Sequence, residues 1–593
     1  MNRTKQLLIS LLTLLCCSTG VWAEGELNGK FTINASGDKV QFSQGNLQYF
    51  CSTTAPEWRF AEHQYDYVAF DISAYAANSE KWIDLFAHGT SGYDNGQTNY
   101  QPYVVGAAAN TYYQGNLTGN ADWGYNPISN GGNTENIGWR TLTRDEWLYV
   151  FSGRSNAASK YGHGSINGVN GMILLPDDWT TPDGLSFTSG KSAWTNSYTL
   201  EQWSLMENAG AVFLPASGSA NSQGIPSEST QNLNGFYRAS TAAYYMYFRQ
   251  GALQNCEMSF YQYGDAVRLV KDYQLQQDAE GNYLIGSAYD WKLFATLVQT
   301  TPTANAKMTA DIDLGTQITM IAEDFDHPYQ GTFDGQGHTL TVNWTTDGED
   351  RVAPFRYAEG ATIKRLHVDG NISKTDAQGR CPAGILACSI GSATTTITEC
   401  WSSVSIYAFD TIGGLFCVAC GNSTTNIIDC VFSGMISASN SWGHSGGFVS
   451  HADKTYLYNT QGAPTVNVTR GLNLGTFTGG ITEAYTFIRA DANSVYGTHT
   501  VNSCYYKNVY GHAQGTQATT AELADGTTTT ALNAGRTGDE AVWVQNSAGY
   551  PCLRVFNPEI PVVRGDVNGD GKVDMDDVKY LVQKILNGKF PDE

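Results

Sequence analysis

Acidic and amide side chains near the C-terminus have the spacing of a metal-binding loop. In a twelve-residue loop that begins at Asp566, Gly571 falls at position six and permits a sharp turn. The expected oxygen ligands are the side chains of Asp566, Asn568, Asp570, Asp574 and Asp577 and the backbone carbonyl of Lys572. Hard oxygen ligands in this order are typical of Ca²⁺ sites. The sequence therefore predicts that residues 566–577 bind calcium.

The segments around this loop indicate which kind of calcium loop it is. Asp577 stands where an EF-hand has a longer, bidentate glutamate. Pro558, Pro561 and the β-branched residues after them argue against a preceding helix. Residues 576–587 have helical spacing and Gly588 would end that helix, with apolar positions at Val578, Leu581, Val582, Ile585 and Leu586.

A loop followed by one helix resembles a dockerin repeat. A complete dockerin has two such repeats, which together bind a cohesin module, and this chain has one. The resemblance implies that residues 557–593 form a small calcium loop-helix tail, with Ca²⁺ as cofactor and a cohesin-like or other protein as partner.

Residues 1–23 are typical of a secretory signal peptide. Arg3 and Lys5 precede an apolar run from Leu7 to Cys17. Residues 21–23 (Val-Trp-Ala) form the expected small-residue cleavage site. Loss of the two positive charges would change the net charge from −22 to −24, which disfavours nucleic acid and anionic membranes as partners. No later segment is long and apolar enough to span a membrane. We expect a secreted or cell-surface protein.

The cysteines allow two interpretations. Ten remain after residue 23, and their spacing fixes no disulfide connectivity. They are either small buried residues or, in an exported protein, disulfide partners.

Residues 24–272 are expected to form an α+β domain of short strands with two capped helices. Thr143 and Glu146 form a predicted capping box for a helix over 143–153, which places Trp147, Val150 and Phe151 on one face. A second helix over 199–208 begins at Thr199 and should bury Leu200 and Trp203.

Four segments of this domain are similar to a known family. They are residues 139–147 (WRTLTRDEW), 168–176 (GVNGMILLP), 210–216 (GAVFLPA) and 266–270 (AVRLV). They resemble the secreted "major paralogous domain" family, a relative of the formylglycine-generating-enzyme branch of the C-type-lectin fold. Those enzymes need a reactive cysteine pair late in the domain, where this chain has only Cys256, with Cys51 far upstream. The resemblance therefore implies a C-type-lectin-like binding domain without that activity.

Tyrosines in this domain recur with the period of a strand. Tyrosine faces can stack on sugar rings or form a protein contact. The candidate ligand-binding residues are Tyr244, Tyr245, Tyr247, Tyr261 and Tyr263. The alternative is a half-buried aromatic sheet.

Residues 273–556 contain an internal repeat with a period of about 30 residues. One series begins at Ile363, Ile397 and Ile427, and a second, richer in glycine, begins at Ala383, Gly413 and Gly446. The two series alternate. Short apolar strands separated by glycine turns at this period predict a right-handed parallel β-helix, in which each rung buries its face by stacking on the next.

The Gly-Gly-Leu-Phe run at 413–416 resembles the GLUG repeats of bacterial surface proteins. Segments 289–294 and 329–338 before it and residues 519–551 after it resemble the usual companions of such repeats. The resemblance implies display and binding, as in an adhesin.

Parallel β-helices also include polysaccharide hydrolases and lyases, so an enzyme is the alternative. A glycosidase needs two carboxylates roughly 5–9.5 Å apart. Asp369 and Asp429 lie at different points of their repeats. Asp334 lies in a turn flanked by glycines, where aspartate is favoured for backbone reasons alone. No catalytic residue is assigned.

The fold class expected is a multidomain, mainly β protein: an α+β C-type-lectin-like domain, a right-handed parallel β-helix and a calcium tail. The function expected is a secreted or cell-surface, adhesin-like protein that binds glycan or protein ligands.

Calcium should order the tail, because the ion neutralises the negative charge that its ligands bring together. A peptide spanning Val563 to Glu593 should gain helical circular dichroism when calcium is added. No gain at millimolar calcium would contradict the calcium assignment.

Overall fold

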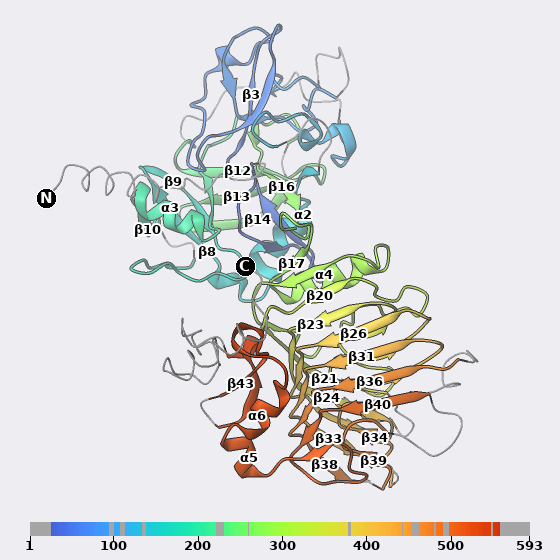
Figure 1. Ribbon diagram of the computed structural model, residues 1–593. Helices are drawn as coiled ribbons and strands as arrows, with labels where there is room; N and C mark the ends of the chain where they lie inside the picture. Colours follow the sequence, from blue (N-terminus) through green and yellow to red (C-terminus); the bar gives the residue numbers. More distant parts are fainter. Residues whose placement is uncertain are drawn as a thin grey trace, which may run out of the picture. The chain divides into compact units, whose positions relative to one another are not determined.

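The computed structural model describes residues 25–557, except 94–99, 107–112, 133–137, 191–192, 221–229, 259, 377–380, 442, 453–461, 480–481, 490–496 and 547–548. The expected signal peptide and the whole calcium loop with its helix therefore lie outside the described residues. The chain divides into two compact units, Met1–Tyr273 and Gln274–Glu593 (Figure 1). None of the helices among the described residues is long and apolar enough to cross a membrane.

Within the described residues, the first unit is built from short strands in four small sheets. Two sheets have the orders β1-β2-β16-β7 (Phe31–Thr32, Lys39–Phe42, Leu269–Asp272, Trp139–Thr141) and β10-β8-β9-β11 (Asn196–Tyr198, Tyr161–Ile166, Val169–Leu174, Val212–Pro215). The others are β14-β13-β12-β15-β6 (Ala252–Met258, Tyr244–Arg249, Asn234–Arg238, Asp265–Ala266, Leu85–Phe86) and β4-β3-β5 (Glu57–Phe60, Leu47–Phe50, Trp82–Ile83). Most strand pairs in this unit are antiparallel.

Both predicted helices of the first unit are confirmed. Helix α2 (Arg144–Leu148) continues into the π-helical turn η7 (Tyr149–Gly153), and the capping box between Thr143 and Glu146 is formed. Its Trp147, Val150 and Phe151 are buried, as predicted. Short 3₁₀ turns lie elsewhere in the unit: η2 (Ile72–Ala74), η5 (Gly119–Ala121), η6 (Trp123–Tyr125) and η8 (Ala157–Ser159).

Helix α3 (Leu200–Asn208) also begins with a capping box, formed by Thr199 and Gln202. Trp203 and Met206 are buried and pack with Phe213 of β11. The prediction that Leu200 is buried is wrong, because this side chain is 47% exposed. Leu200 is the first residue of the helix, and only the later turns reach the core.

The second unit contains a parallel β-solenoid, which confirms the predicted parallel stacking of rungs. Its first long sheet has the order β17-β18-β20-β23-β26-β31-β36-β40, with every pair parallel. These strands span Tyr283–Ile285, Ala306–Met308, Thr332–Asp334, Thr362–Lys364, Thr394–Thr398, Thr424–Ile428, Thr465–Thr469 and Thr498–Asn502. Figure 1 shows them lying one beside the next.

Further parallel sheets form the other sides of the solenoid. The largest has the path β38-β33-β28-β24-β27-β32-β37-β41-β42 with β19 and β21 attached (Thr476–Gly479, Met435–Ala438, Ser405–Ala408, His367–Lys374, Trp401–Ser402, Val431–Phe432, Leu472–Asn473, Tyr505–Tyr506, Thr516–Gln517, Ile312–Asp313, Thr339–Thr346). The smaller ones are β22-β25-β30-β35 (Phe355–Ala358, Leu386–Ser389, Phe416–Ala419, Val449–Ala452) and β29-β34-β39 (Ile412–Gly413, Ser445–Gly446, Ala484–Tyr485).

The two repeat series predicted from the sequence lie in register on neighbouring rungs. Ile363 pairs with Ile397, which pairs with Ile427, and all three are fully buried. In the second series Leu386 pairs with Phe416 and Phe416 with Val449. The glycines of this series are required by close packing, because a Cβ on Gly413 or Gly446 would lie within 2 Å of a backbone carbonyl oxygen.

Several successive rungs turn a corner at a residue in the left-handed conformation. Five such residues have φ between 51° and 54°: Arg365, Glu399, Asp429, Arg470 and Ser503. The backbone N–H of each of the first four donates to a carbonyl of the next rung, at 2.9 to 3.1 Å. This conformation costs a non-glycine residue about 1 kcal/mol or more, so the stacking of rungs has to offset it.

Helices and a hairpin complete the unit. The amphipathic α4 (Ala288–Val298) buries Trp291 and Phe294 against the first rungs. After the last rung come α5 (Thr520–Ala524), α6 (Thr527–Leu532), η9 (Gly538–Glu540), the antiparallel pair β43 (Trp543–Gln545) and β44 (Pro551–Leu553), and η10 (Arg554–Phe556). We call residues 519–556 the C-terminal cap.

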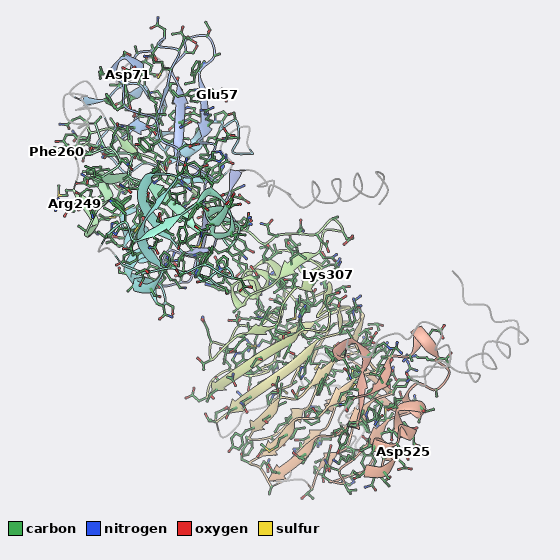
Figure 2. The ribbon with its side chains drawn as sticks, turned by 90° about the vertical axis from the view of Figure 1, so that its left-hand side faces the viewer. Glu57, Asp71, Arg249, Phe260, Lys307 and Asp525 are labelled. Carbon is green, nitrogen blue, oxygen red and sulfur yellow. The ribbon has the colours of Figure 1, made fainter. Side chains whose placement is uncertain are left out.

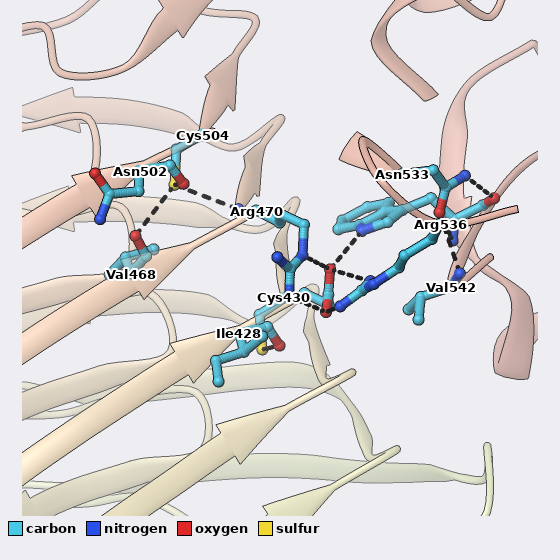
Figure 3. Close-up of polar contacts among 12 residues, drawn as sticks. Ile428, Cys430, Val468, Arg470, Asn502, Cys504, Asn533, Arg536 and Val542 are labelled. Atoms are coloured by element: carbon cyan, nitrogen blue, oxygen red, sulfur yellow. Dashed lines mark hydrogen bonds and ion pairs between the residues drawn. The ribbon is translucent and has the colours of Figure 1, made fainter. Parts of the chain in front are cut away.

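A buried carboxylate is one of the contacts that attach the C-terminal cap to the solenoid. Asp429, at a rung corner, is 2% exposed. Its oxygens accept hydrogen bonds from Arg470 on the next rung (2.9 Å) and from Arg536 (2.7 and 3.0 Å) and Trp543 (2.9 Å) of the cap. Figure 3 shows Arg470 and Arg536 reaching this carboxylate from opposite sides. Burial raises its pKa, but the hydrogen bonds from Arg536 and Arg470 outweigh burial and hold the pKa below its usual value.

All ten cysteines of the described residues are free thiols, nine buried and Cys552 half-buried. Of the two interpretations of the sequence, the structure supports small buried residues. Cys400 and Cys430 occupy equivalent places on successive rungs, and each thiol lies 3.3 Å from the carbonyl oxygen two residues earlier.

The variant Asp429→Asn should lower the free energy of unfolding by about 3 kcal/mol, because it leaves two arginines without a counter-charge. Since the pKa of Asp429 is lowered in the folded state, its stabilisation is present above about pH 4 and is lost on further acidification. Urea unfolding should therefore show a larger difference between wild type and variant at pH 7 than at pH 3. Asp347→Asn, at an exposed carboxylate of the same unit, is the matched control, and an equal effect of both variants at pH 7 would contradict this role.

Candidate functional site

One face of the sheet that contains β12 and β13 carries aromatic side chains. Phe236 pairs with Tyr247 and Arg238 pairs with Tyr245, so these four side chains share a face. The ring of Phe236 lies 4.7 Å from that of Tyr247 and 5.5 Å from that of Tyr245. The predicted period of two is confirmed on β13, but the predicted exposure is wrong for Tyr247, which is only 9% exposed. Tyr261 and Tyr263 lie in a turn rather than on a strand.

Tyr244 does not belong to this face. It alternates with Tyr245 and lies on the side of Met246 and Phe248, which are core residues. Its ring packs against that core and stacks with the guanidinium of Arg144 at 5.0 Å. The strand pleat sends neighbouring side chains to opposite faces, so the five candidate tyrosines cannot form one surface.

A buried ion pair positions the segment that contains Tyr261 and Tyr263. Nε of Arg238 lies 3.0 Å from Oδ2 of Asp265, and both side chains are at most 1% exposed. Burial raises the pKa of Asp265 and lowers that of Arg238, and their mutual attraction opposes both shifts. Nη2 of Arg238 also donates to the carbonyls of Phe260 (3.1 Å) and Tyr263. This pair therefore fixes the backbone of 260–263 beside Tyr245.

We define the aromatic surface as the side chains of Phe236, Tyr245, Tyr247, Phe260, Tyr261 and Tyr263. The most exposed ring is that of Phe260, at 60%, and Met258 beside it in the sequence is 74% exposed. Figure 2 places Phe260 at the periphery of the first unit. The ring of Tyr263 lies 5.1 Å from that of Phe260. Such rings can stack on the apolar face of a sugar or on apolar groups of a protein.

The aromatic surface continues into the loop after β6, which the sequence prediction did not include. Tyr261 lies 5.5 Å from His88, His88 lies 5.9 Å from Tyr113, and Tyr113 lies 5.5 Å from Tyr93. Burial, and then the charge of Arg238, lower the pKa of His88 to about 4, so the ring is neutral at pH 7. The concentration of tyrosines between 93 and 113 was the only sequence signal for this extension.

Cys51 and Cys256 do not form a reactive pair in this unit. Both are buried free thiols, and burial raises their pKa values to about 11 and about 12. A thiolate nucleophile requires the opposite shift.

In the solenoid, the carboxylates considered as catalytic candidates are engaged in structural contacts. Asp334 accepts hydrogen bonds from Arg365 and lies 3.4 Å from Nζ of Lys364. Asp429 joins the rungs to the C-terminal cap. Asp369 accepts a hydrogen bond of 2.6 Å from Ser403.

Ser403, His367 and Asp369 form a hydrogen-bonded group that the sequence did not reveal. Nε2 of His367 lies 2.8 Å from Oγ of Ser403, which donates to Asp369. Ser403 thus lies between His367 and Asp369. In a catalytic triad the histidine lies between the serine and the aspartate, so this order differs from that of a triad. His367 also stacks on Trp401 at 4.2 Å and contacts Phe556 of the C-terminal cap. The group links rungs to each other and to the cap.

Within the described residues, no three His, Cys, Asp or Glu side chains lie close enough to hold a metal ion. The calcium ligands predicted at Asp566, Asn568, Asp570, Lys572, Asp574 and Asp577 lie outside those residues.

The fold of the second unit places this chain among the proteins that contain a parallel β-solenoid. No model of a known protein family matches the chain, and no curated protein sequence matches it. Among solved structures, a candidate immunoglobulin A1 protease from Bacteroides ovatus matches at 14% identity with a TM-score of 0.35, over 47% of this chain and 94% of that one. An IgA1 protease matches at 14% identity with a TM-score of 0.26, over 43% of this chain and 22% of that one. Similarity at this level assigns neither a family nor an activity.

His367 should make stability depend on pH. Burial lowers its pKa to about 4, so the folded state binds this proton less readily than the unfolded state, whose histidines titrate near pH 6.5. The stabilisation is complete above about pH 6.5 and falls by about 2–3 kcal/mol as the pH drops to about 4. In His367→Gln, urea unfolding should show a smaller loss between pH 7 and pH 4.5 than in wild type, and an identical loss would contradict a buried neutral histidine.

Proposed function

We propose that this protein is a secreted or cell-surface, adhesin-like binding protein that recognises glycan or protein ligands through the aromatic surface of its first unit. The observation that supports this most is that several aromatic rings share one sheet face and the adjoining segment 260–263. The segment 260–263 is held by the buried Arg238–Asp265 ion pair, and the ring of its Phe260 is 60% exposed. A rigid aromatic platform of this kind binds a planar or apolar ligand face at a small entropic cost.

The roles of the other parts follow from the sequence. The first unit is proposed to be C-type-lectin-like, and the solenoid to be a GLUG-like domain that displays it. The signal peptide would direct export. The tail 557–593 would bind Ca²⁺ and attach the protein to a cohesin-like or other partner.

The alternative function is that of a carbohydrate-active enzyme, and the experiment has to distinguish it from that of a binding protein. The purified mature protein should be screened against a panel of polysaccharides, for binding and for released reducing ends. Binding without release supports the proposal. Release that persists when Asp566 and Asp570 are replaced would favour a hydrolase or lyase instead.

Phe260→Ala should weaken binding of a glycan ligand about 10-fold, which corresponds to the loss of roughly 1.4 kcal/mol of stacking. Folding should be unchanged, because the ring is mostly exposed. Tyr125→Ala, a change at another exposed ring of the same unit (40%), is the control and should leave the affinity unchanged. Isothermal titration calorimetry with a neutral glycan selected from the panel provides the measurement, and equal affinity of both variants would exclude the aromatic surface as the binding site.

A further inference from the structure

The second unit has a cavity of about 720 Å³ near the first rungs of the solenoid. Its walls come from α4, from the segment 317–325 and from two arginines, Arg351 and Arg356. This volume suits one or two sugar rings or a short peptide. All of its lining residues belong to one unit.

The two arginines of this cavity are incompletely satisfied. Nε of Arg351 and Nε of Arg356 are buried and have no hydrogen-bond partner among the described residues. Arg351 also makes no ion pair with any residue that the structure describes. Arg356 has one distant partner, Glu349, at 3.4 Å. Both side chains are half-buried. Burying a guanidinium N–H without an acceptor costs free energy, and a bound anion would offset that cost.

The carboxylates near the cavity also make other contacts. Glu323 lines the cavity and accepts from the backbone N–H of Met320 at 3.4 Å. Burial lowers the pKa of Arg351, and the charge of Asp350 is among the influences that outweigh burial and raise it. Asp350, next to Arg351 in the sequence, lies 3.5 Å from Nζ of Lys374. Asp324, which lines the cavity, accepts from the backbone N–H of Asp326 (3.0 Å) and contacts His327 (3.2 Å). The lining contains three cationic side chains, Lys292, Arg351 and Arg356, and two carboxylates, Glu323 and Asp324, so its formal charge is +1, although the whole chain carries −22.

The remainder of the lining suits hydroxyl groups and a ring face. Gln299, Gln317 and Thr296 can donate and accept hydrogen bonds. Phe325 and Tyr357 form an edge-to-face pair at 5.6 Å on one wall. Hydroxyl partners, an aromatic wall and two arginines together match a sugar that carries a carboxylate better than they match an acidic peptide.

We infer that this cavity binds acidic glycans, with the carboxylate of a uronic or sialic acid residue paired to Arg351 and Arg356. The site lies in the second unit and does not rest on the aromatic surface of the first. Phe260→Ala should therefore leave acidic-glycan binding unchanged.

The test uses calorimetry on the full chain with two probes, an oligogalacturonate and sialyllactose. The control ligands are the same two oligosaccharides with their carboxylates reduced to alcohols. We expect at least one acidic probe to bind at least about 10-fold more tightly than its reduced form, as expected for a charge-assisted hydrogen bond. Equal binding of both forms, or no binding of either acidic probe, would overturn the inference.

Arg351→Met should lower the affinity for the acidic probe about 10-fold or more. Arg249→Met, at an exposed arginine of the first unit (Figure 2), makes the same change of charge and should have no effect. If thermal unfolding shows that Arg351→Met is misfolded, Arg356→Gln is judged by the same criterion. An unchanged affinity in the folded variant would overturn the inference. The inference would also be overturned if polyglutamate bound in an Arg351-dependent way while the acidic glycans did not bind.

Discussion

The second unit depends on one constraint: each rung of the solenoid must lie directly on the next. A fully buried isoleucine such as Ile397 contributes about 1.5–3 kcal/mol, whereas a backbone hydrogen bond contributes about 1 kcal/mol net. Per residue, the stacked side chains therefore stabilise the solenoid more than the backbone hydrogen bonds between rungs do. This stacking is strong enough to offset the left-handed corners at Arg365 and Asp429, whose amides each bond to the following rung. The same closeness leaves no room for a side chain at Gly413.

Buried charge in this protein is used mainly to join elements. Asp429 joins the rungs to the C-terminal cap, Asp334 joins two corners through Arg365, and the Arg238–Asp265 pair holds a loop on a sheet. Each of these groups has a partner of opposite charge or several donors, as buried ions require. Arg351 differs, because it lies at a corner with φ of 56° beside a cavity and lacks such a partner among the described residues. The unpartnered Nε of Arg351 beside the cavity is the reason why we propose the cavity as a binding site for an anionic ligand.

In the first unit, the strand pleat decides which aromatic residues are available. Tyr245 and Tyr247 share one face with Phe236, while Tyr244 packs on the core side. A single-residue shift of register would exchange the two sets. The buried Arg238 then holds the backbone of the segment that contains the exposed Phe260 and the half-buried Tyr263.

The sequence by itself determined the features that are local. The capping boxes at Thr143 and Thr199 and the roughly 30-residue repeat involve neighbours in the chain or a regular period, and both were predicted. Only the tertiary structure brought His88 and Tyr113 to Tyr261, Arg536 to Asp429, and Ser403 to His367. These contacts join residues far apart in sequence, and their geometry depends on how complete strands and rungs pack. No local pattern of residue types records that packing.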